Sequence, residues 1–161
     1  MIGGLDHVAI NTEKPEATKR FYCEILGLET LPRPDFGIHG YWLGRSENGQ
    51  MAPFIHLVSH ADQRSDYSET RRTVDHVALK TKGFTAICAC LDRAGLPWYG
   101  SIIDSIGIWQ IKVYDPNGVL LELNFDAAQE QEPTPEIPLQ NRRRSGGGFF
   151  DASAYEAFGA A

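Results

Sequence analysis

The stretch Asp6-His7-Val8-Ala9-Ile10 decides the fold, because it returns 69 residues later as Asp75-His76-Val77-Ala78-Leu79. Two further segments repeat in the same order at nearly the same offset: Leu26-Gly27-Leu28 as Ala94-Gly95-Leu96, and residues 54–58 as residues 120–124. Three repeated segments in one order indicate two copies of a single module of about 60 residues.

Each copy is expected to form the elements β-α-β-β-β. Alternating apolar residues predict a strand over 5–11, then a helix that starts at Pro15 and ends at Gly27. The second copy predicts a strand over 74–81 and a helix over 84–94. The remaining strands are expected at 28–32, 40–45, 52–58, 98–103, 108–114 and 119–125. The expected fold class is α+β, with two tandem βαβββ modules (about 5–58 and 74–125) forming an eight-stranded curved sheet or open barrel with the helices outside.

Composition and charge limit the possible partners. The chain of 161 residues is 42% hydrophobic and 22% charged, which is typical of a globular domain, here expected over residues 1–126. A net charge of −6 argues against nucleic acid as a partner. No apolar run approaches the roughly 20 residues that span a membrane. The N-terminus lacks the basic and apolar regions of a signal peptide, so we expect a cytoplasmic protein.

Residues 127–161 have a different composition from the rest. Residues 127–141 are rich in Gln, Glu and Pro, and are followed by Arg142-Arg143-Arg144 and Gly146-Gly147-Gly148, which predicts a linker. Aromatic residues then return near the end: Phe149, Phe150, Tyr155 and Phe158. We expect this C-terminal extension to dock on the domain or on a partner subunit, and we expect a homodimer.

Side-chain parity identifies four candidate metal ligands. Alternate residues of a strand face opposite sides of the sheet, so His7 and His76 point away from the helices that cover their apolar neighbours. The same parity places His56 and Glu122 on these faces. A single strand histidine is more often a hydrogen-bonded core residue, but a glutamate between two leucines is costly unless it is paired or bound to metal. Three imidazoles and a carboxylate suit one divalent ion: Fe, Ni, Co, Zn or Mn.

With these residues, the chain resembles the vicinal oxygen chelate superfamily, which contains glyoxalase I, bleomycin resistance proteins, methylmalonyl-CoA epimerase, fosfomycin-resistance transferases and extradiol dioxygenases. The resemblance covers residues 5–125. Residues 7–10, followed by Phe21-Tyr22 and Leu26-Gly27-Leu28, are similar to a glyoxalase I signature. The turn Asp115-Pro116-Asn117-Gly118 before Leu121-Glu122-Leu123 is similar to the superfamily's common ending. The resemblance implies that His7, His76 and Glu122 occupy the most widespread ligand positions, and His56 the fourth.

The resemblance favours a lyase or isomerase, in which Glu122 is both metal ligand and general base for a substrate that chelates the metal through vicinal oxygens. Glyoxalases usually carry a carboxylate where this chain has His56, and a basic residue where it has Glu24. These two departures argue against glutathione as part of the substrate.

Two alternatives remain. The first is a one-domain Fe(II) extradiol dioxygenase with His7, His76 and Glu122 as its ligands, although that family places a tyrosine where this chain has Lys112. The second is a small-molecule binding or resistance protein without catalysis. In each case, the residues expected to line the substrate pocket are Trp42, Trp109, Gln110 and Lys112. His39 and His60 lie in predicted loops and are assigned no role.

Overall fold

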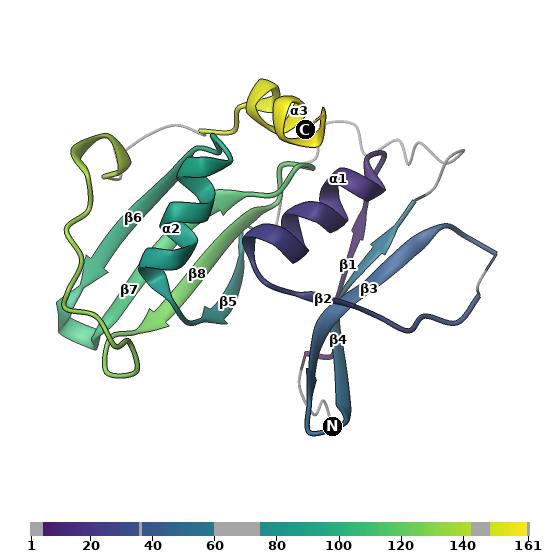
Figure 1. The fold of residues 1–161 in the computed structure, drawn as a ribbon, viewed down its shortest axis with the longest axis horizontal. Coiled ribbons are helices and arrows are strands. Elements are labelled where there is room, and N and C mark those ends of the chain that lie inside the picture. The colour runs from purple at the N-terminus through teal and green to yellow at the C-terminus, as the bar shows by residue number, and fades with distance from the viewer. Residues whose placement is uncertain (1–4, 36, 60–74, 143–148, 161) are drawn as a thin grey trace. The chain divides into compact units, whose positions relative to one another are not determined.

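The structure, a computed structural model, describes residues 5–35, 37–59, 75–142 and 149–160. The chain divides into two compact units, Met1–Glu69 and Thr70–Ala161. Each unit contains a four-stranded mixed sheet with a helix packed on it (Figure 1), as the repeat predicted. His60, Arg143, Arg144 and residues 146–148 lie outside the described residues.

The first unit follows the expected element order. It contains β1 (Val8–Asn11), α1 (Pro15–Arg20), a π-helical turn (Phe21–Ile25), β2 (Glu29–Leu31), β3 (Gly40–Glu47) and β4 (Gln50–Val58). The strand order in the sheet is β1-β4-β3-β2, in which β1 and β4 are parallel and the other neighbours are antiparallel. The hairpin between β3 and β4 turns at Asn48 and Gly49, which both have positive φ, as a tight hairpin turn requires.

The second unit repeats this topology. It contains β5 (Val77–Thr81), α2 (Phe84–Arg93), β6 (Trp98–Ile103), a 3-10 turn (Asp104–Ile106), β7 (Ile108–Tyr114) and β8 (Leu120–Asp126). The strand order is β5-β8-β7-β6, again with the first pair parallel. The fold class predicted from the repeat is therefore confirmed at the level of two βαβββ modules.

The cores of both units lie between helix and sheet, on the face that parity predicted. In β4, Ile55 and Leu57 are at most 1% exposed, and in β8 so are Leu121 and Leu123. His56 and Glu122, which alternate with these residues, lie on the opposite face and keep a small solvent-exposed fraction. The apolar stripes of the helices complete the two cores, with Phe21, Tyr22 and Ile25 in the first unit and Phe84, Ile87 and Leu91 in the second.

Three predicted elements, two strands and one helix, differ from the structure in their length or type. The strands expected over 5–11 and 74–81 begin only at Val8 and Val77, where pairing with β4 and β8 starts. His7 and His76 therefore stand immediately before β1 and β5. The helix expected from Pro15 to Gly27 is α-helical only as far as Arg20 and continues as a π-helical turn.

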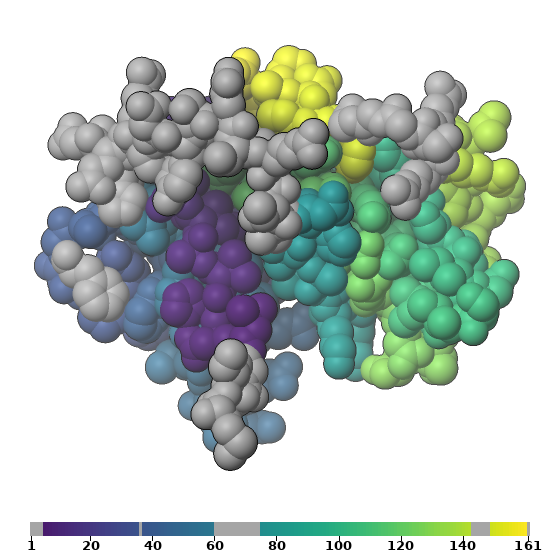
Figure 2. Space-filling view, turned by 180° about the vertical axis from the view of Figure 1, so that it is seen from behind, coloured from purple at the N-terminus to yellow at the C-terminus, as the bar shows by residue number. Residues whose placement is uncertain are grey.

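Residues after Asp126 pack on the second unit. The Glu130 carboxylate accepts hydrogen bonds from the Gly83 and Phe84 amides at the start of α2, at 3.0 Å each. Residue 142 then forms an isolated bridge with Gly100 on β6. Helix α3 (Ala152–Ala160), yellow in Figure 2, buries Tyr155 and Phe158, and the Tyr155 hydroxyl donates to the Tyr114 carbonyl of β7.

Candidate functional site

In the first unit, two candidate ligands and an aromatic side chain form a stack. The rings of His7 and His56 lie 3.9 Å apart between centroids, and the Trp42 indole stacks on His56 at 4.7 Å. Backbone pairing explains the alignment, because Trp42 on β3 lies opposite His56 on β4, while Ala9 on β1 flanks His56 on its other side. The structure thus brings together His7, His56 and Trp42.

The environment of His56 favours the neutral form of its imidazole. Burial lowers the pKa of His56, and the neighbouring His7 lowers it further. Its Nε2 atom is buried and has no hydrogen-bond partner among the residues that the structure describes. A buried polar atom without a partner is costly, and a neutral imidazole nitrogen is the form that binds a metal ion. His56 therefore has the chemistry of a metal ligand.

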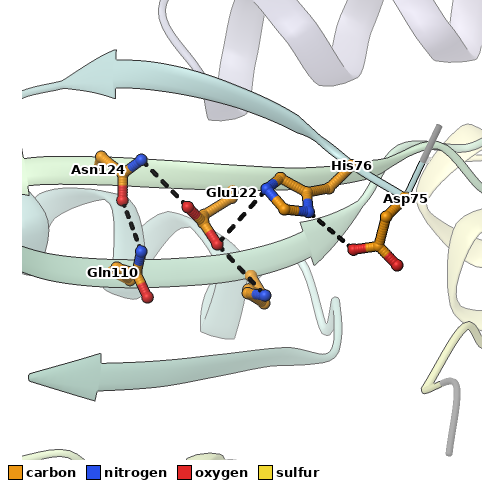
Figure 3. Close-up of polar contacts among 6 residues, drawn as sticks. Asp75, His76, Gln110, Glu122 and Asn124 are labelled. Atoms are coloured by element: carbon orange, nitrogen blue, oxygen red, sulfur yellow. Dashed lines mark hydrogen bonds and ion pairs between the residues drawn. The ribbon is translucent and has the colours of Figure 1, made fainter.

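In the second unit, the equivalent positions carry charges. Glu122 on β8 lies beside Ala78 on β5 and opposite Lys112 on β7, so Glu122 corresponds to His56, and Lys112 corresponds to Trp42. The Glu122 Oε2 atom lies 3.2 Å from Lys112 Nζ and 3.8 Å from His76 Nε2 (Figure 3). The second unit thus brings together His76, Glu122 and Lys112.

The Asn124 amide holds the other Glu122 oxygen, and the Gln110 amide in turn holds Asn124. Asn124 Nδ2 donates to Glu122 Oε1 at 3.2 Å, and Gln110 Nε2 donates to Asn124 Oδ1 at 2.9 Å (Figure 3). The Glu122 side chain is 13% exposed, so these contacts fix a largely desolvated carboxylate. Gln110 and Lys112 therefore share the face of β7 that carries the polar network.

Trp109 lies on the opposite face of β7. Its side chain is 4% exposed and its ring packs edge-on against Phe84 of α2, with centroids 5.7 Å apart. Parity explains this position, because odd-numbered residues of β7 face the helix and even-numbered residues face the polar network. We therefore leave Trp109 out of the proposed substrate pocket, in which Trp42, Gln110 and Lys112 remain.

Asp6 and Asp75 are functional candidates that were not singled out from the sequence. Asp6 Oδ2 lies 2.6 Å from His7 Nδ1, and Asp75 Oδ2 lies 2.7 Å from His76 Nδ1. An aspartate that holds one ring nitrogen leaves Nε2 to bind a metal ion and fixes the ring orientation. The signal was present in the sequence, because the repeat begins with Asp-His in both modules.

The four candidate ligands divide equally between the units. Each unit contributes a pair, His7 with His56 and His76 with Glu122. Within the described ranges, no three His, Cys, Asp or Glu side chains cluster closely enough to hold a metal ion. The donor set nevertheless fits a divalent transition ion, since three Nε2 atoms and one carboxylate are among its preferred ligands.

The part of the sheets that carries these residues is accessible. The His7 and His76 side chains are 37% and 32% exposed. Figure 2 shows β1, purple, at the surface of the first unit. Among the described residues, no helix has the length and apolar character needed to cross a membrane.

Known structures have the same fold. A glyoxalase family protein from Bacillus anthracis is 21% identical, with a TM-score of 0.58 over 78% of this chain and 97% of the other. The trypanothione-dependent glyoxalase I of Leishmania major is 18% identical, with a TM-score of 0.60 over 78% of this chain and 88% of the other. A genomically encoded fosfomycin resistance protein from Listeria monocytogenes is 19% identical, with a TM-score of 0.57 over 78% and 94%.

The family of this chain follows from a match to a family model that covers most of the sequence. No curated protein matches the chain. Residues 4–123 match the family model of the Glyoxalase/Bleomycin resistance protein/Dioxygenase superfamily, and this match covers most of the 161 residues. Metal-dependent glyoxalase I and fosfomycin resistance enzymes are members of this superfamily. The chain therefore belongs to the Glyoxalase/Bleomycin resistance protein/Dioxygenase superfamily.

Proposed function

We propose that this protein is a metal-dependent lyase or isomerase that acts on a small molecule with two adjacent oxygen atoms. One observation supports the proposal best: His56 and Glu122 occupy equivalent register positions in the two modules, and each has a histidine beside it. Metal binding is typical of the superfamily to which the chain belongs.

In this proposal, His7, His56, His76 and Glu122 bind one divalent ion, which is Fe, Ni, Co, Zn or Mn. Asp6 and Asp75 fix the tautomers of His7 and His76, so that Nε2 is the metal-binding atom. When bound, the ion acts as a Lewis acid that polarises a substrate oxygen. Its charge also compensates the desolvated Glu122 carboxylate.

Glu122 is the proposed general base: it accepts a proton from the hydroxyl-bearing carbon next to the substrate carbonyl and returns it to the former carbonyl carbon, while the hydroxyl proton passes to the former carbonyl oxygen. Asn124 holds one carboxylate oxygen, and Gln110 orients Asn124, so the base has a fixed direction. Trp42 offers an apolar face to the substrate, and Lys112 offers a positive charge. The proposed substrate class is an α-hydroxycarbonyl compound, which has oxygens on two adjacent carbons and an acidic C–H bond on the carbon that bears the hydroxyl.

Metal analysis of the full chain, purified without chelator, tests the site. We expect about one divalent ion per chain in the unmodified protein, and a loss of metal affinity of more than tenfold in His7→Ala and in His76→Ala, since even the loss of an outer-shell partner costs about 10–100-fold. His39→Ala is the control, because His39 is exposed and contacts only the Tyr41 ring among the described aromatic residues. Unchanged metal content in both variants would contradict the proposed site.

The identity of the metal separates the two enzymatic alternatives. Nickel, cobalt, zinc or manganese in the purified protein supports the lyase or isomerase. Iron, together with activity that is lost on exposure to air, would instead favour an extradiol dioxygenase.

We also propose that the protein forms a homodimer. Tyr155 and Phe158 are buried within the second unit, so they need no partner subunit to cover them. Phe150 remains 41% exposed and is the aromatic residue of the extension that a partner would cover. Sedimentation at micromolar concentration is expected to give the mass of a dimer, and a monomer would contradict this assignment.

A further inference from the structure

We propose that Lys112 is an internal counter-ion that competes with the metal for Glu122 and thereby weakens metal binding. The inference rests on the proposed role of Glu122 as a metal ligand. It concerns a residue that the superfamily membership does not explain, and it depends only on contacts within the second unit.

The Lys112 ammonium group lies beside one of the two Glu122 carboxylate oxygens. Lys112 Nζ lies 3.2 Å from Glu122 Oε2, and the nearest ring nitrogen of His76 lies 3.8 Å from the same oxygen. The other oxygen, Oε1, accepts the hydrogen bond from Asn124. Oε2 is therefore the oxygen that faces His76, and it is the oxygen that a metal shared with His76 would need. The ammonium group already occupies a position beside it.

Backbone register makes this contact persistent. Lys112 and Glu122 are direct partners in the antiparallel β7–β8 ladder, so their side chains leave the sheet side by side. The Lys112 and Glu122 side chains are 18% and 13% exposed, which leaves little water to screen either charge. A carboxylate with so little solvent needs a positive partner, and in the metal-free protein Lys112 supplies it.

Metal binding would change this balance of charge. A divalent ion at Glu122 places two positive charges next to the ammonium group, and the repulsion is strong where water is scarce. The metal must therefore displace Lys112 from Oε2 before it gains full access to the carboxylate. In the first unit, the equivalent position is occupied by the uncharged Trp42, so the competition is specific to the second module.

Titration calorimetry of the full chain, stripped of metal and then titrated with Zn²⁺ or with Ni²⁺, tests the inference. We expect Lys112→Met to bind each ion at least about tenfold more tightly than the unmodified protein, because a positive charge has been removed from beside the site. Lys112→Gln should change affinity in the same direction while keeping a hydrogen-bond donor for Glu122. Lys80→Met is the matched control: Lys80 is an exposed lysine of β5, paired in register with Asn124, and its loss should leave the affinity unchanged.

The outcomes separate this inference from the proposed function. If His76→Ala weakens binding but both Lys112 variants bind as well as or less well than the unmodified protein, Lys112 is not a competitor and the metal site stands. If neither Zn²⁺ nor Ni²⁺ binds to any of these proteins, both the site and the competition are wrong. Tighter binding in Lys80→Met as well would show a general charge effect, and would overturn the specific role of Lys112.

Discussion

Replacing Glu122 by glutamine is expected to slow proton transfer by about 10²- to 10⁴-fold, the usual contribution of a general base. Glutamine keeps the shape of the side chain and can still bond to Asn124, which donates to Glu122 Oε1. It removes the negative charge and the proton-accepting oxygen. Activity is therefore expected to fall much further than metal content, since the three histidine ligands of the proposal remain.

Proton transfer can be measured without knowing the full substrate. A small hydroxyketone such as dihydroxyacetone has two adjacent oxygens and an exchangeable C–H bond. The exchange of this C–H hydrogen for deuterium in D₂O can be followed by NMR, and its rate reports the proton transfer assigned to Glu122. The same samples are analysed for metal, so that loss of base and loss of metal are measured separately.

Glu47→Gln is the control for this experiment, because Glu47 is an exposed residue at the end of β3. It should exchange deuterium and bind metal as the unmodified protein does. If Glu122→Gln retained metal and exchanged at the original rate, Glu122 would be a ligand without a catalytic role. The binding-protein alternative would then be favoured.

The sequence predicted the elements of the two modules because strand and helix periodicity survive in both copies. Ile55 and Leu57 in one copy, and Leu121 and Leu123 in the other, are buried as the alternation required. The π-helical turn after Arg20 was not predictable, since an apolar stripe does not distinguish α from π spacing over five residues. The start of β1 depends on its pairing with Ile55, a contact between residues far apart in the chain.

For the candidate site, side-chain parity separates the polar face from the core face in β4, β7 and β8. Trp109 differs in parity from Gln110 and Lys112, so the alternation alone places it on the helix-facing side of β7. The sequence could not reveal the stack of Trp42 on His56, or the shared approach of Lys112 and His76 to one oxygen, because both depend on register across strands.

Truncation of Tyr155 to alanine is expected to cost about 3–5 kcal/mol of stability, the usual effect of removing a large buried aromatic side chain. Tyr155 is 2% exposed, stacks with Phe150 at 5.4 Å and donates its hydroxyl to the Tyr114 carbonyl. For a chain of this length, each kcal/mol lowers the melting temperature by about 2–4 °C. Thermal unfolding should therefore show a decrease of roughly 10 °C.

Two control variants accompany Tyr155→Ala: one isolates the hydroxyl of Tyr155, and the other tests an exposed position of the same helix. Tyr155→Phe removes only the hydroxyl, and is expected to cost about 1 kcal/mol because one hydrogen bond is lost. Glu156→Ala changes an exposed residue of the same helix and should leave the melting temperature unchanged within error. Because alanine is at least as good a helix former as glutamate, an equal decrease in Glu156→Ala would show that the helix is sensitive to any substitution, and would contradict the specific packing role of Tyr155.

The dependence of the stability loss on protein concentration distinguishes docking of α3 on its own chain from docking on a partner subunit. Because Tyr155 packs against Tyr114 of its own chain, its contribution to stability should be the same at low and high concentration. Docking on a partner subunit would instead make the loss depend on concentration, through mass action. A concentration-dependent loss would contradict packing within the chain and would move α3 into the dimer interface. Tyr114 ends the strand that carries Gln110 and Lys112, so an anchored helix also stabilises the strand on which the proposed pocket depends.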